Sequence, residues 1–468
     1  MTEDFQIPTN LLQLLSSEQA HHYRIVPIES HNGTIAFKSD KVSEGLQQEL
    51  RVVLNTDIEL IEDTSENIQN YLSVNFRKSK NIQSENLHYS SDFLDKLLMT
   101  AKDIGSSDIH FEPYEHKCRV RFRMDGKLKE QFIIALHEYP VIVNKLKIQA
   151  GLDISEKRLP QDGRITVKTV KNEFDIRVSS LPTLHGEKMV LRILSKDATH
   201  IDLDALGFTE SELRTYKETV RKPNGIILIS GPTGSGKTTT LYATLKLLNN
   251  DDTNILTIED PIEYTLEGVN QVQLKENIGL DFSSTLRTFL RQDPDIIMVG
   301  EIRDAKTANM AIRAALTGHL VLSTIHTNSA WATISRLIDM GIPSFLIAST
   351  LNVSVAQRLV RKLCVHCKQK STITKELFPS NFEIPKHLKS HFLATGCNAC
   401  HHTGYQGRKA IYEIIPITKI LVQHIKENDL EVDSYLEEHN VSTLRSNAVS
   451  MIEEGITSID EVYALLSD

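Results

Sequence analysis

A phosphate-binding pattern lies near the middle of this 468-residue chain. The segment GPTGSGKTTTLY follows an apolar run, GIILIS, and leads into a stretch with helical character. Glycines let the backbone curl so that its N–H groups face an anion, and the start of the next helix adds partial positive charge. The residues expected to hold a nucleoside triphosphate are Gly231, Pro232, Thr233, Gly234, Ser235, Gly236, Lys237 and Thr238.

Polar residues follow three further apolar runs that are typical of strands. NILTIED ends with Glu259, DIIMVGE ends with Glu301, and GHLVLSTIH ends with His326. Ligands of parallel sheets bind beyond the carboxyl ends of the strands, so we expect these side chains beside the phosphate loop. Hydrolysis of ATP needs a carboxylate in the Mg²⁺ shell and a polar group that orients water.

Each of these residues receives one expected role. Glu301 and Thr238 would bind Mg²⁺, while Lys237 would reach the β- and γ-phosphates. Glu259 would orient or activate the attacking water, and His326 would sense the γ-phosphate. Taken singly, each carboxylate or histidine could instead be a solvated or capping residue. That simpler interpretation is favoured for His319, at the start of the third run.

Two Cys-x-x-Cys pairs follow, separated by 29 residues. Four thiolates at this spacing suit a tetrahedral Zn²⁺ site, because each pair presents two sulfurs to one centre. One pair alone could be redox-active, but the second pair argues against it. Neighbouring histidines could also serve as ligands, although four cysteines complete the sphere. The expected zinc ligands are Cys364, Cys367, Cys397 and Cys400.

Two further expectations concern the elements around the cysteines. A helix that includes Gln357 and Arg358 is expected before the first pair, and the zinc would be structural because no open coordination position is evident. The fifth cysteine, Cys118 in HKCRVRF, is expected to pack inside a strand.

Composition narrows the classes of function. The chain has 52 basic and 61 acidic residues, a net charge of −9, which offers no overall electrostatic case for binding nucleic acid. No apolar run is long enough to span a bilayer, and the N-terminus lacks the pattern of a secretory signal. Five cysteines are too few for a disulfide scaffold, so a reducing, cytoplasmic location is expected.

The order of the patterns predicts several modules. Helical character up to Gly105 and an Asp125-Gly126 hairpin signal indicate an α+β module, while later strands and helices alternate as in a mainly parallel α/β sheet. The expected parts are a small N-terminal α/β module (1–75), a polar linker (76–90), the α+β module (91–200) and the ATPase domain (201–468), which contains a tetracysteine subdomain (360–410).

The ordered motifs resemble those of the secretion ATPase superfamily, the motor ATPases of type II secretion and type IV pilus assembly. The segments that carry the likeness run from about 105 to 415 and include SSDIHFEP, RLPQDGRI, GPTGSGKTTTLY, TIEDPIEY, DIIMVGEIRD, TGHLVLSTIHTNSA and QRLVRKLC. The resemblance implies a RecA-like ATPase domain, a preceding domain of PAS-like topology and a hexameric ring. It also implies that the TIEDPIEY and TIHTN segments serve catalysis.

The same resemblance extends to residues and partners. Arginines of the preceding domain contact nucleotide phosphates in the family, and Arg164 and Arg177 fall on the matching positions. The first 75 residues correspond to a module that docks to the inner-membrane platform, which would place the chain peripherally at that membrane. They lack the motif with which some relatives bind a cyclic dinucleotide.

Three alternatives to an assembly motor remain at this stage. The tetracysteine insert favours assembly over pilus retraction, because retraction relatives usually lack it. A RecA-like motor that translocates nucleic acid would share the core fold, but the negative charge opposes it. A non-catalytic, zinc-stabilised scaffold would show no ATP turnover.

Overall fold

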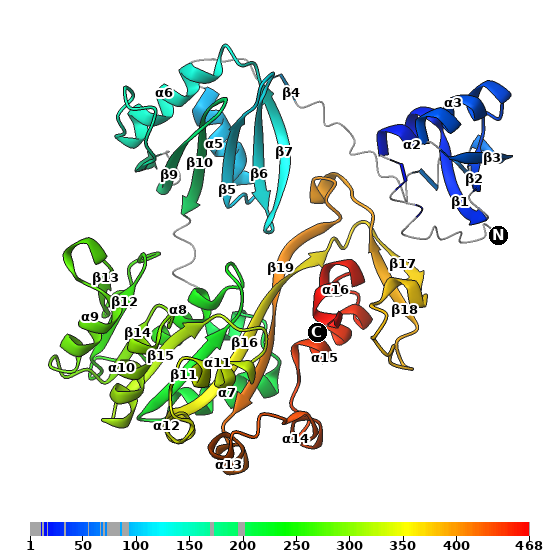
Figure 1. Ribbon diagram of the computed structural model, residues 1–468. Helices are drawn as coiled ribbons and strands as arrows, with labels where there is room; N and C mark the ends of the chain where they lie inside the picture. The colour runs from blue at the N-terminus through cyan, green and yellow to red at the C-terminus, as the bar shows by residue number, and fades with distance from the viewer. Residues whose placement is uncertain are drawn as a thin grey trace. The chain divides into compact units, whose positions relative to one another are not determined.

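The computed structural model contains two compact units, Met1–Leu194 and Ser195–Asp468 (Figure 1). The structure describes residues 11, 14–15, 17–31, 34–54, 56–65, 67–68, 71–72, 85–86, 93–168, 173–194 and 202–467. Within these ranges, every helix is too short or too polar to cross a lipid bilayer.

The N-terminal part is a small α/β module, in agreement with its sequence pattern. Its three strands form a sheet in the order β1-β2-β3, in which β1 and β2 are antiparallel and β2 and β3 are parallel. Ile25, Phe37, Leu50 and Ile58 pack in its core. The elements are α2 (Ser17–Tyr23), β1 (Ile25–His31), β2 (Thr34–Ser39), α3 (Glu44–Leu54) and β3 (Asp57–Glu62).

The second module contains a sheet in the order β4-β7-β6-β5-β10-β9-β8. Its helix α5 ends at Asp103, before Gly105 with φ 71°, and the Asp125-Gly126 turn joins β6 to β7 with φ of 46° and 85°, as predicted. The elements are β4 (Glu85–Asn86), α5 (Phe93–Asp103), β5 (Asp108–Pro113), β6 (Cys118–Met124), β7 (Lys127–Ile134), α6 (Tyr139–Ala150), β8 (Gln161–Lys168), β9 (Glu173–Thr183) and β10 (Gly186–Leu194).

Two details of this module bear on the sequence predictions. Cys118 is fully buried in β6, and burial raises the pKa of its thiol to about 12, as expected for a packing residue. Glu85 and Asn86 pair with β7 as an edge strand, although they lie in the range expected to be a linker. The other residues of that range, 76–90, lie outside the described residues.

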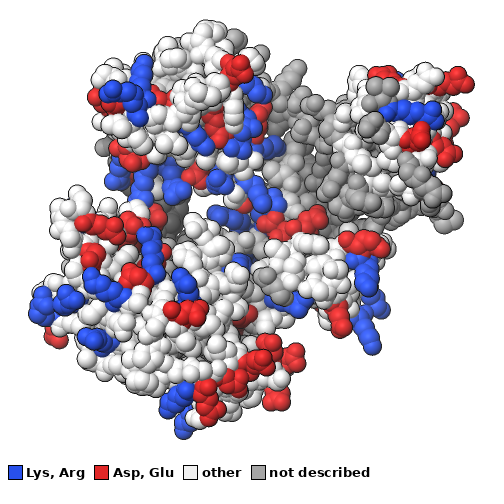
Figure 2. All heavy atoms as spheres, in the orientation of Figure 1, with Lys and Arg blue, Asp and Glu red and all other residues white. Residues whose placement is uncertain are grey.

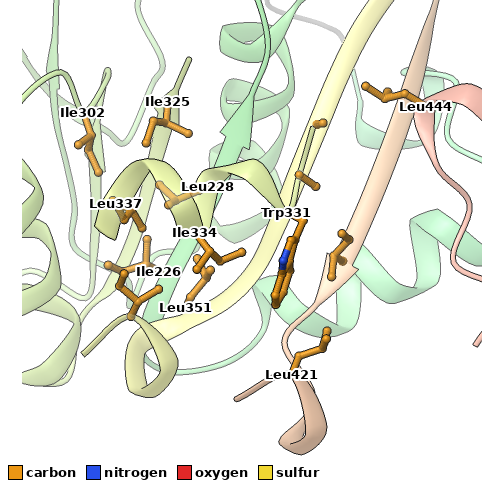
Figure 3. Close-up of a cluster of buried hydrophobic side chains, with 14 of the residues drawn as sticks. Ile226, Leu228, Ile302, Ile325, Trp331, Ile334, Leu337, Leu351, Leu421 and Leu444 are labelled. Carbon is orange, nitrogen blue, oxygen red and sulfur yellow. The ribbon is translucent and has the colours of Figure 1, made fainter. Parts of the chain in front are cut away.

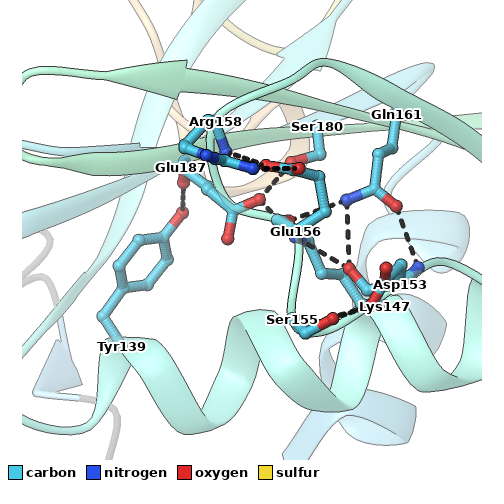
Figure 4. Close-up of polar contacts among 9 residues, drawn as sticks. All are labelled: Tyr139, Lys147, Asp153, Ser155, Glu156, Arg158, Gln161, Ser180 and Glu187. Atoms are coloured by element: carbon cyan, nitrogen blue, oxygen red, sulfur yellow. Dashed lines mark hydrogen bonds and ion pairs between the residues drawn. The ribbon is translucent and has the colours of Figure 1, made fainter.

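A buried ion pair fixes the segment that leads into β8. Lys147 of α6 is fully buried and lies 2.5 Å from Glu187 of β10 (Figure 4). Its ammonium also donates to the backbone oxygen of Glu156 at 2.7 Å, and Ser180 donates to Glu187 at 2.8 Å. A buried charge pair is tolerated only when its remaining hydrogen-bonding groups are satisfied. Here those groups are the backbone of the 151–160 segment and Ser180.

The second unit is built on a sheet in the order β13-β12-β14-β15-β11-β16-β19. Every neighbouring pair is parallel except β16 with β19. The strands are β11 (Gly225–Ser230), β12 (Ile255–Glu259), β13 (Asn270–Gln273), β14 (Ile296–Val299), β15 (Leu320–Ile325), β16 (Leu351–Leu363) and β19 (Tyr405–Pro416). The helices are α7 (Glu210–Val220), α8 (Lys237–Leu248), α9 (Phe282–Phe289), α10 (Ala305–Leu316), α11 (Ala332–Asp339) and α12 (Ser344–Thr350).

Side chains of the central strand point alternately into two cores. Ile226 and Leu228 of β11 pack in one cluster with Ile334 and Leu337 of α11 (Figure 3). Their neighbours Ile227 and Ile229 pack in the other cluster. Both faces of the sheet are therefore covered, which explains the continuous apolar runs of its strands.

The helix expected through Gln357 and Arg358 is wrong, because both residues lie in strand β16. β16 pairs with β11 in parallel and with β19 in antiparallel register, so its backbone is hydrogen-bonded on both sides. Its β-branched residues, such as Val353 and Val355, are fully buried and suit a strand packed between two sheet neighbours.

The rest of the second unit consists of a hairpin insert and a helical C-terminal part. The insert carries β17 (Lys368–Thr372) and β18 (Ser390–Ala394), which pair with each other between β16 and β19 in the sequence. The C-terminal helices are α13 (Lys419–Glu427), α14 (Asp433–Glu438), α15 (Leu444–Glu453) and α16 (Ile459–Ser467). Helix α15 contacts β16, β18 and β19 and so lies between the sheet and the insert.

Candidate functional site

The phosphate loop connects β11 to α8, as the sequence predicts. Gly231, Gly234 and Gly236 have φ of 147°, 81° and 88°, in the region that favours glycine. A Cβ atom on Gly231 would lie 2.4 Å from the backbone oxygen of Gln357. The loop can therefore keep this path only with glycine at that position.

Lys237, the first residue of α8, folds back over this loop. Its ammonium donates to the backbone oxygens of Gly231 and Pro232 at 2.8 and 3.0 Å. Burial lowers the pKa of Lys237, the charge of Glu301 opposes that shift, and the charge of Arg358 adds to it. The Lys237 ammonium is therefore close enough to the Glu301 carboxylate and the Arg358 guanidinium to interact electrostatically with both.

The loop residues fit a triphosphate. The Ser235 hydroxyl is buried and has no hydrogen-bond partner in the protein, so the loop contains a donor that a phosphate oxygen would satisfy. The positive end of α8 and the ammonium of Lys237 offer complementary charge to the same anion. Thr238 is exposed in the first turn of α8, where its hydroxyl is accessible to a bound ion.

The structure brings Glu301 and His326 together near Lys237. Glu301 follows β14, and its carboxylate lies 3.4 Å from Nε2 of His326, which follows β15. Arg303 forms an ion pair with the same carboxylate. Glu301 is mostly buried, with 16% of its side chain exposed, whereas 50% of the His326 side chain is exposed. An acid and an imidazole therefore face each other at the carboxyl ends of two adjacent strands.

Glu259 is also at a strand end, but its carboxylate is enclosed. Thr257 and Gln271 donate to one oxygen at 2.7 and 3.0 Å, and the hydroxyl of Tyr242 in α8 donates to the other. Burial and the charge of Glu259 raise the pKa of Tyr242. A carboxylate held by three donors is fixed in orientation, and Tyr242 connects it to the helix that starts with Lys237.

His319 lies at the opposite end of β15, as the simpler interpretation predicted. Its Nδ1 is 2.8 Å from the backbone oxygen of Ala314, and its own backbone oxygen accepts from the N–H of Gly225. The ring satisfies a carbonyl at the C-terminus of α10, a common position for histidine. This residue therefore has a structural role.

The two predicted arginines lie directly opposite each other on one face of the second module's sheet. Arg164 of β8 pairs in register with Arg177 of β9. Arg177 in turn pairs with Arg192 of β10. Arg164 forms an ion pair with Asp175, and Arg192 lies 3.0 Å from Asp108. Three arginines therefore form one row across three strands of the first unit.

Sequence reasoning missed two of the basic residues near these groups. Arg192 lies in MVLRIL, where alternation places it on the polar face of its strand, and only the register shows that it extends the arginine row. Arg358 was assigned to a helix, yet in β16 its guanidinium lies beside the phosphate loop, 3.1 Å from the position of a Cβ on Gly231. Neither position follows from local spacing.

The four predicted zinc ligands meet at the base of the insert. Their sulfur atoms all lie within 4.8 Å of one another. The separations Cys364–Cys397, Cys367–Cys400 and Cys397–Cys400 are each 3.8 Å. A tetrahedral site with Zn–S bonds of about 2.3 Å has sulfur–sulfur separations of about 3.8 Å.

Backbone donors surround this sulfur cluster. The N–H groups of Gly396 and Gly404 point at the sulfurs of Cys367 and Cys400 at 3.2 Å. Such donors favour the thiolate, the form that binds a metal. The histidines next to the cysteines, His366, His401 and His402, are exposed, so the sulfur cluster does not depend on them. The geometry fits Zn²⁺ with a closed, structural coordination sphere.

The phosphate loop on a parallel sheet, with Glu301 and His326 at adjacent strand ends, defines the class of protein, a P-loop ATPase. The chain belongs to the Type II/IV secretion system protein family, whose model matches residues 83–464.

Individual relatives agree with this membership. The chain is 47% identical over 381 residues to the type IV pilus assembly ATPase PilB of Pseudomonas aeruginosa, covering 80% of this chain and 67% of that protein. It is 43% identical to the type II secretion system ATPase E of Vibrio cholerae, covering 82% of this chain and 78% of the relative. The fold is similar to that of the Legionella pneumophila ATPase DotB, with a TM-score of 0.61 at 21% identity over 81% of this chain and 96% of that one.

Proposed function

We propose that the chain is a motor ATPase that drives assembly of a type IV pilus or of the pseudopilus of type II secretion. The observation that carries the proposal is the 47% identity to a pilus assembly ATPase. The tetracysteine cluster supports the same choice, because the family resemblance implies that assembly motors commonly carry such an insert and retraction motors usually lack it.

The architecture of the proposed motor follows the family. The sheet of the second unit would be a RecA-like core, and the α+β module of residues 91–200 would be the PAS-like domain before it. Residues 1–75 would dock to a protein partner at the inner-membrane platform, and the motor would be a hexameric ring at the cytoplasmic side of that membrane. Its cofactors would be ATP, Mg²⁺ and a structural Zn²⁺.

The residues of the phosphate loop would hold ATP. Lys237 would leave the carbonyls of Gly231 and Pro232 and pair with the β- and γ-phosphates. Thr238 and Glu301 would hold Mg²⁺, which when bound supplies positive charge against the phosphates. His326, beside Glu301, would contact the γ-phosphate and report its presence to the rest of the domain.

Charge that develops on the transferred phosphoryl group would be neutralised by arginine. Arg164 and Arg177 project from the same face of the sheet and would supply guanidinium groups to a nucleotide. In that role Arg164 would exchange its ion pair with Asp175 for a phosphate.

Glu259 would orient the attacking water, and Tyr242 would fix the orientation of the Glu259 carboxylate. Replacing Tyr242 with phenylalanine removes one donor to the carboxylate and leaves the ring. We expect kcat to fall about tenfold with KM within about twofold, since a group that acts mainly in the transition state changes kcat. The measurement is steady-state ATP turnover by the full-length chain.

A matched control for this variant is Tyr216→Phe. Tyr216 is another fully buried tyrosine of the second unit, but its hydroxyl pairs with Thr244 at 2.8 Å and not with a carboxylate. If both variants lose turnover equally, the loss reflects packing of the core and Tyr242 has no special relation to Glu259.

The proposed function predicts the phenotype of a deletion. Cells without the gene should form no pili, or should retain secreted proteins in the periplasm, because an assembly motor is missing. Electron microscopy of surface filaments and assays of culture supernatants measure both outcomes. Cells that instead carry excess, non-retracting pili would indicate a retraction motor and contradict the proposal.

A nucleic-acid motor makes a different prediction. Figure 2 shows acidic and basic side chains interspersed on the visible face of the second unit. Nucleic-acid translocation would require turnover that rises with DNA and falls steeply with salt. We expect ATP turnover by this chain to be unchanged when DNA is added.

A further inference from the structure

The loop that carries His326 follows β15 and is fixed by side chains of strands β16 and β19. Ser354 of β16 donates to the backbone oxygen of Ala330 at 2.6 Å. Arg358 of the same strand donates to the backbone oxygen of Asn328 at 2.6 Å. The N–H of Ala330 donates at 2.7 Å to a carboxylate oxygen of Glu413 in β19. The backbone four residues after His326 is therefore anchored to a buried acid.

Glu413 binds a second segment with its other oxygen. That oxygen accepts from the N–H of Leu444, the first residue of α15, at 3.1 Å. Only 5% of Glu413 is exposed. Burial raises the pKa of this carboxyl, while the two N–H donors and the charge of Arg358 act in the opposite direction. One side chain thus connects the His326 loop to the start of a helix more than 100 residues later in the sequence.

Apolar packing accompanies both contacts. Trp331 follows Ala330, and Leu444 carries the second donor; both are buried in the same hydrophobic cluster (Figure 3). The indole N–H of Trp331 also donates to the backbone oxygen of Leu430 at 2.9 Å. The loop and the helix are therefore packed on one core, which makes a rigid connection physically reasonable.

The far end of α15 holds the tetracysteine insert. Gly455, two residues after the helix, accepts from the ammonium of Lys368 at 2.7 Å, and Ile456 accepts from the N–H of Leu363 at 2.7 Å. Lys368 and Leu363 directly flank the Cys364–Cys367 pair in the sequence. Farther along, Glu461 of α16 forms an ion pair with Arg361 at 2.5 Å.

We propose that Glu413 is a positioning residue that fixes the His326 loop and transmits its movement through α15 to the tetracysteine insert. The inference rests on the proposed role of His326 at the γ-phosphate. When the histidine engages a phosphate, the backbone at Ala330 moves and carries the Glu413 carboxylate with it. Because both carboxylate oxygens are occupied, the shift is passed to Leu444 and along α15. The conformation of the insert therefore depends on whether a nucleotide is bound.

The test replaces Glu413 with glutamine in the full-length, zinc-containing chain. The amide keeps the shape but presents an NH₂ group to one of the two N–H donors, so one contact is lost. We expect kcat to fall by at most about tenfold with KM within about twofold, since Ser354 and Arg358 still hold the His326 loop and its contact with Glu413 is weakened. Glu454→Gln is the matched control, because Glu454 is exposed at the end of the same α15.

The decisive measurement is amide hydrogen exchange with and without a non-hydrolysable ATP analogue and Mg²⁺. In the parent chain, the analogue should change exchange in the phosphate loop and also in residues 364–372 and 390–404. In Glu413→Gln the phosphate loop should still respond, while the insert should not. A response of the insert that persists in this variant, or is missing in the parent chain, overturns the proposal.

A second variant isolates the contact with the helix. Leu444→Pro removes the N–H donor of Leu444 at the first helical position, where proline is well tolerated. It also replaces a buried leucine side chain, a loss that the control Leu444→Ala shares while keeping the N–H. The preceding residue, Thr443, already has the extended conformation that proline requires, with φ −87° and ψ 164°. Turnover should stay within about threefold of the parent chain while the insert loses its response to nucleotide. An insert that still responds contradicts the proposal even if Glu413→Gln fails to fold.

His326→Ala separates this inference from the proposed function. Full turnover by His326→Ala would show that the histidine has no role in ATP hydrolysis. The exchange response of the insert in the Glu413 and Leu444 variants would still decide whether Glu413 connects the loop to the insert.

Discussion

Replacing Lys237 with alanine is expected to abolish ATP turnover while the fold is kept. The side chain is the one ammonium that the structure places on the phosphate loop within the described residues, where it now donates to the carbonyls of Gly231 and Pro232. Removing a preorganised donor from developing charge costs about 10²- to 10³-fold in kcat, and loss of a full charge in a buried site should reach at least the upper end of that range. Coupled-enzyme assays of phosphate release measure the effect.

The fold should survive because both cores of the sheet are formed by apolar side chains of the strands and helices, which this substitution leaves in place. Its pKa is lowered by burial, so removal of the ammonium also relieves a desolvated charge. Lys246→Ala is the matched control, since that lysine lies on the same helix and pairs with Asp202 at 2.7 Å. Circular dichroism and the melting temperature should be similar for both variants. Parent-level turnover in Lys237→Ala would contradict the assignment of the site.

Local pattern was sufficient for the path of the phosphate loop and for the clustering of the four cysteines. In GPTGSGKTTTLY the residue types themselves indicate a loop between a strand and a helix, and the backbone path at 231 and 236 favours glycine because of its positive φ and close neighbours. The cysteines were predicted for a similar reason. Each short turn presents two sulfurs, and a single centre receives all four when the chain brings the second turn beside the first. Neither case depends on distant pairing.

The errors and omissions arise where pairing with distant residues decides the structure. The apolar positions of LNVSVAQRLVRKL suit a helix or a buried strand, and only the partners β11 and β19 select the strand. Glu413 carries no local signal, because its two donors come from Ala330 and Leu444. Arg192 was likewise missed because its neighbour Arg177 is set by sheet register.

Removal of zinc is expected to unfold the insert while the phosphate loop keeps its ability to bind ATP. The insert has little core of its own: Leu363, Ala394 and Tyr405 are the buried residues of its cluster, and β17 and β18 form a hairpin of two strands. A hairpin of this size is marginal in water, whereas a structural Zn²⁺ contributes on the order of 10 kcal/mol to folding. The metal would therefore supply most of the stability of residues 364–372 and 390–404, whereas Phe378, Phe382 and Leu388 between them pack in the main core.

The variant that tests this expectation is Cys397→Ser. It removes one sulfur that lies 3.8 Å from Cys364 and from Cys400, and with it the closed coordination sphere. The purified variant should contain much less than one zinc per chain by metal analysis, and amide exchange in residues 364–372 and 390–404 should rise towards the rate of an unfolded segment. Binding of a fluorescent ATP analogue should stay within about threefold of the parent affinity, because the phosphate loop joins β11 to α8 and neither element belongs to the insert.

Cys118→Ala provides the matched control, because Cys118 is buried in β6 of the first unit and lies outside the cluster. That variant should keep one zinc per chain and full protection of the insert. A parent chain that contains no zinc, or a Cys397→Ser variant with an undisturbed insert, would contradict the structural role of the metal. Since the residues just after α15 accept hydrogen bonds from Lys368 and Leu363, which flank the first cysteine pair, a loosened insert should also stop responding to nucleotide. This outcome separates loss of coupling from loss of ATP binding.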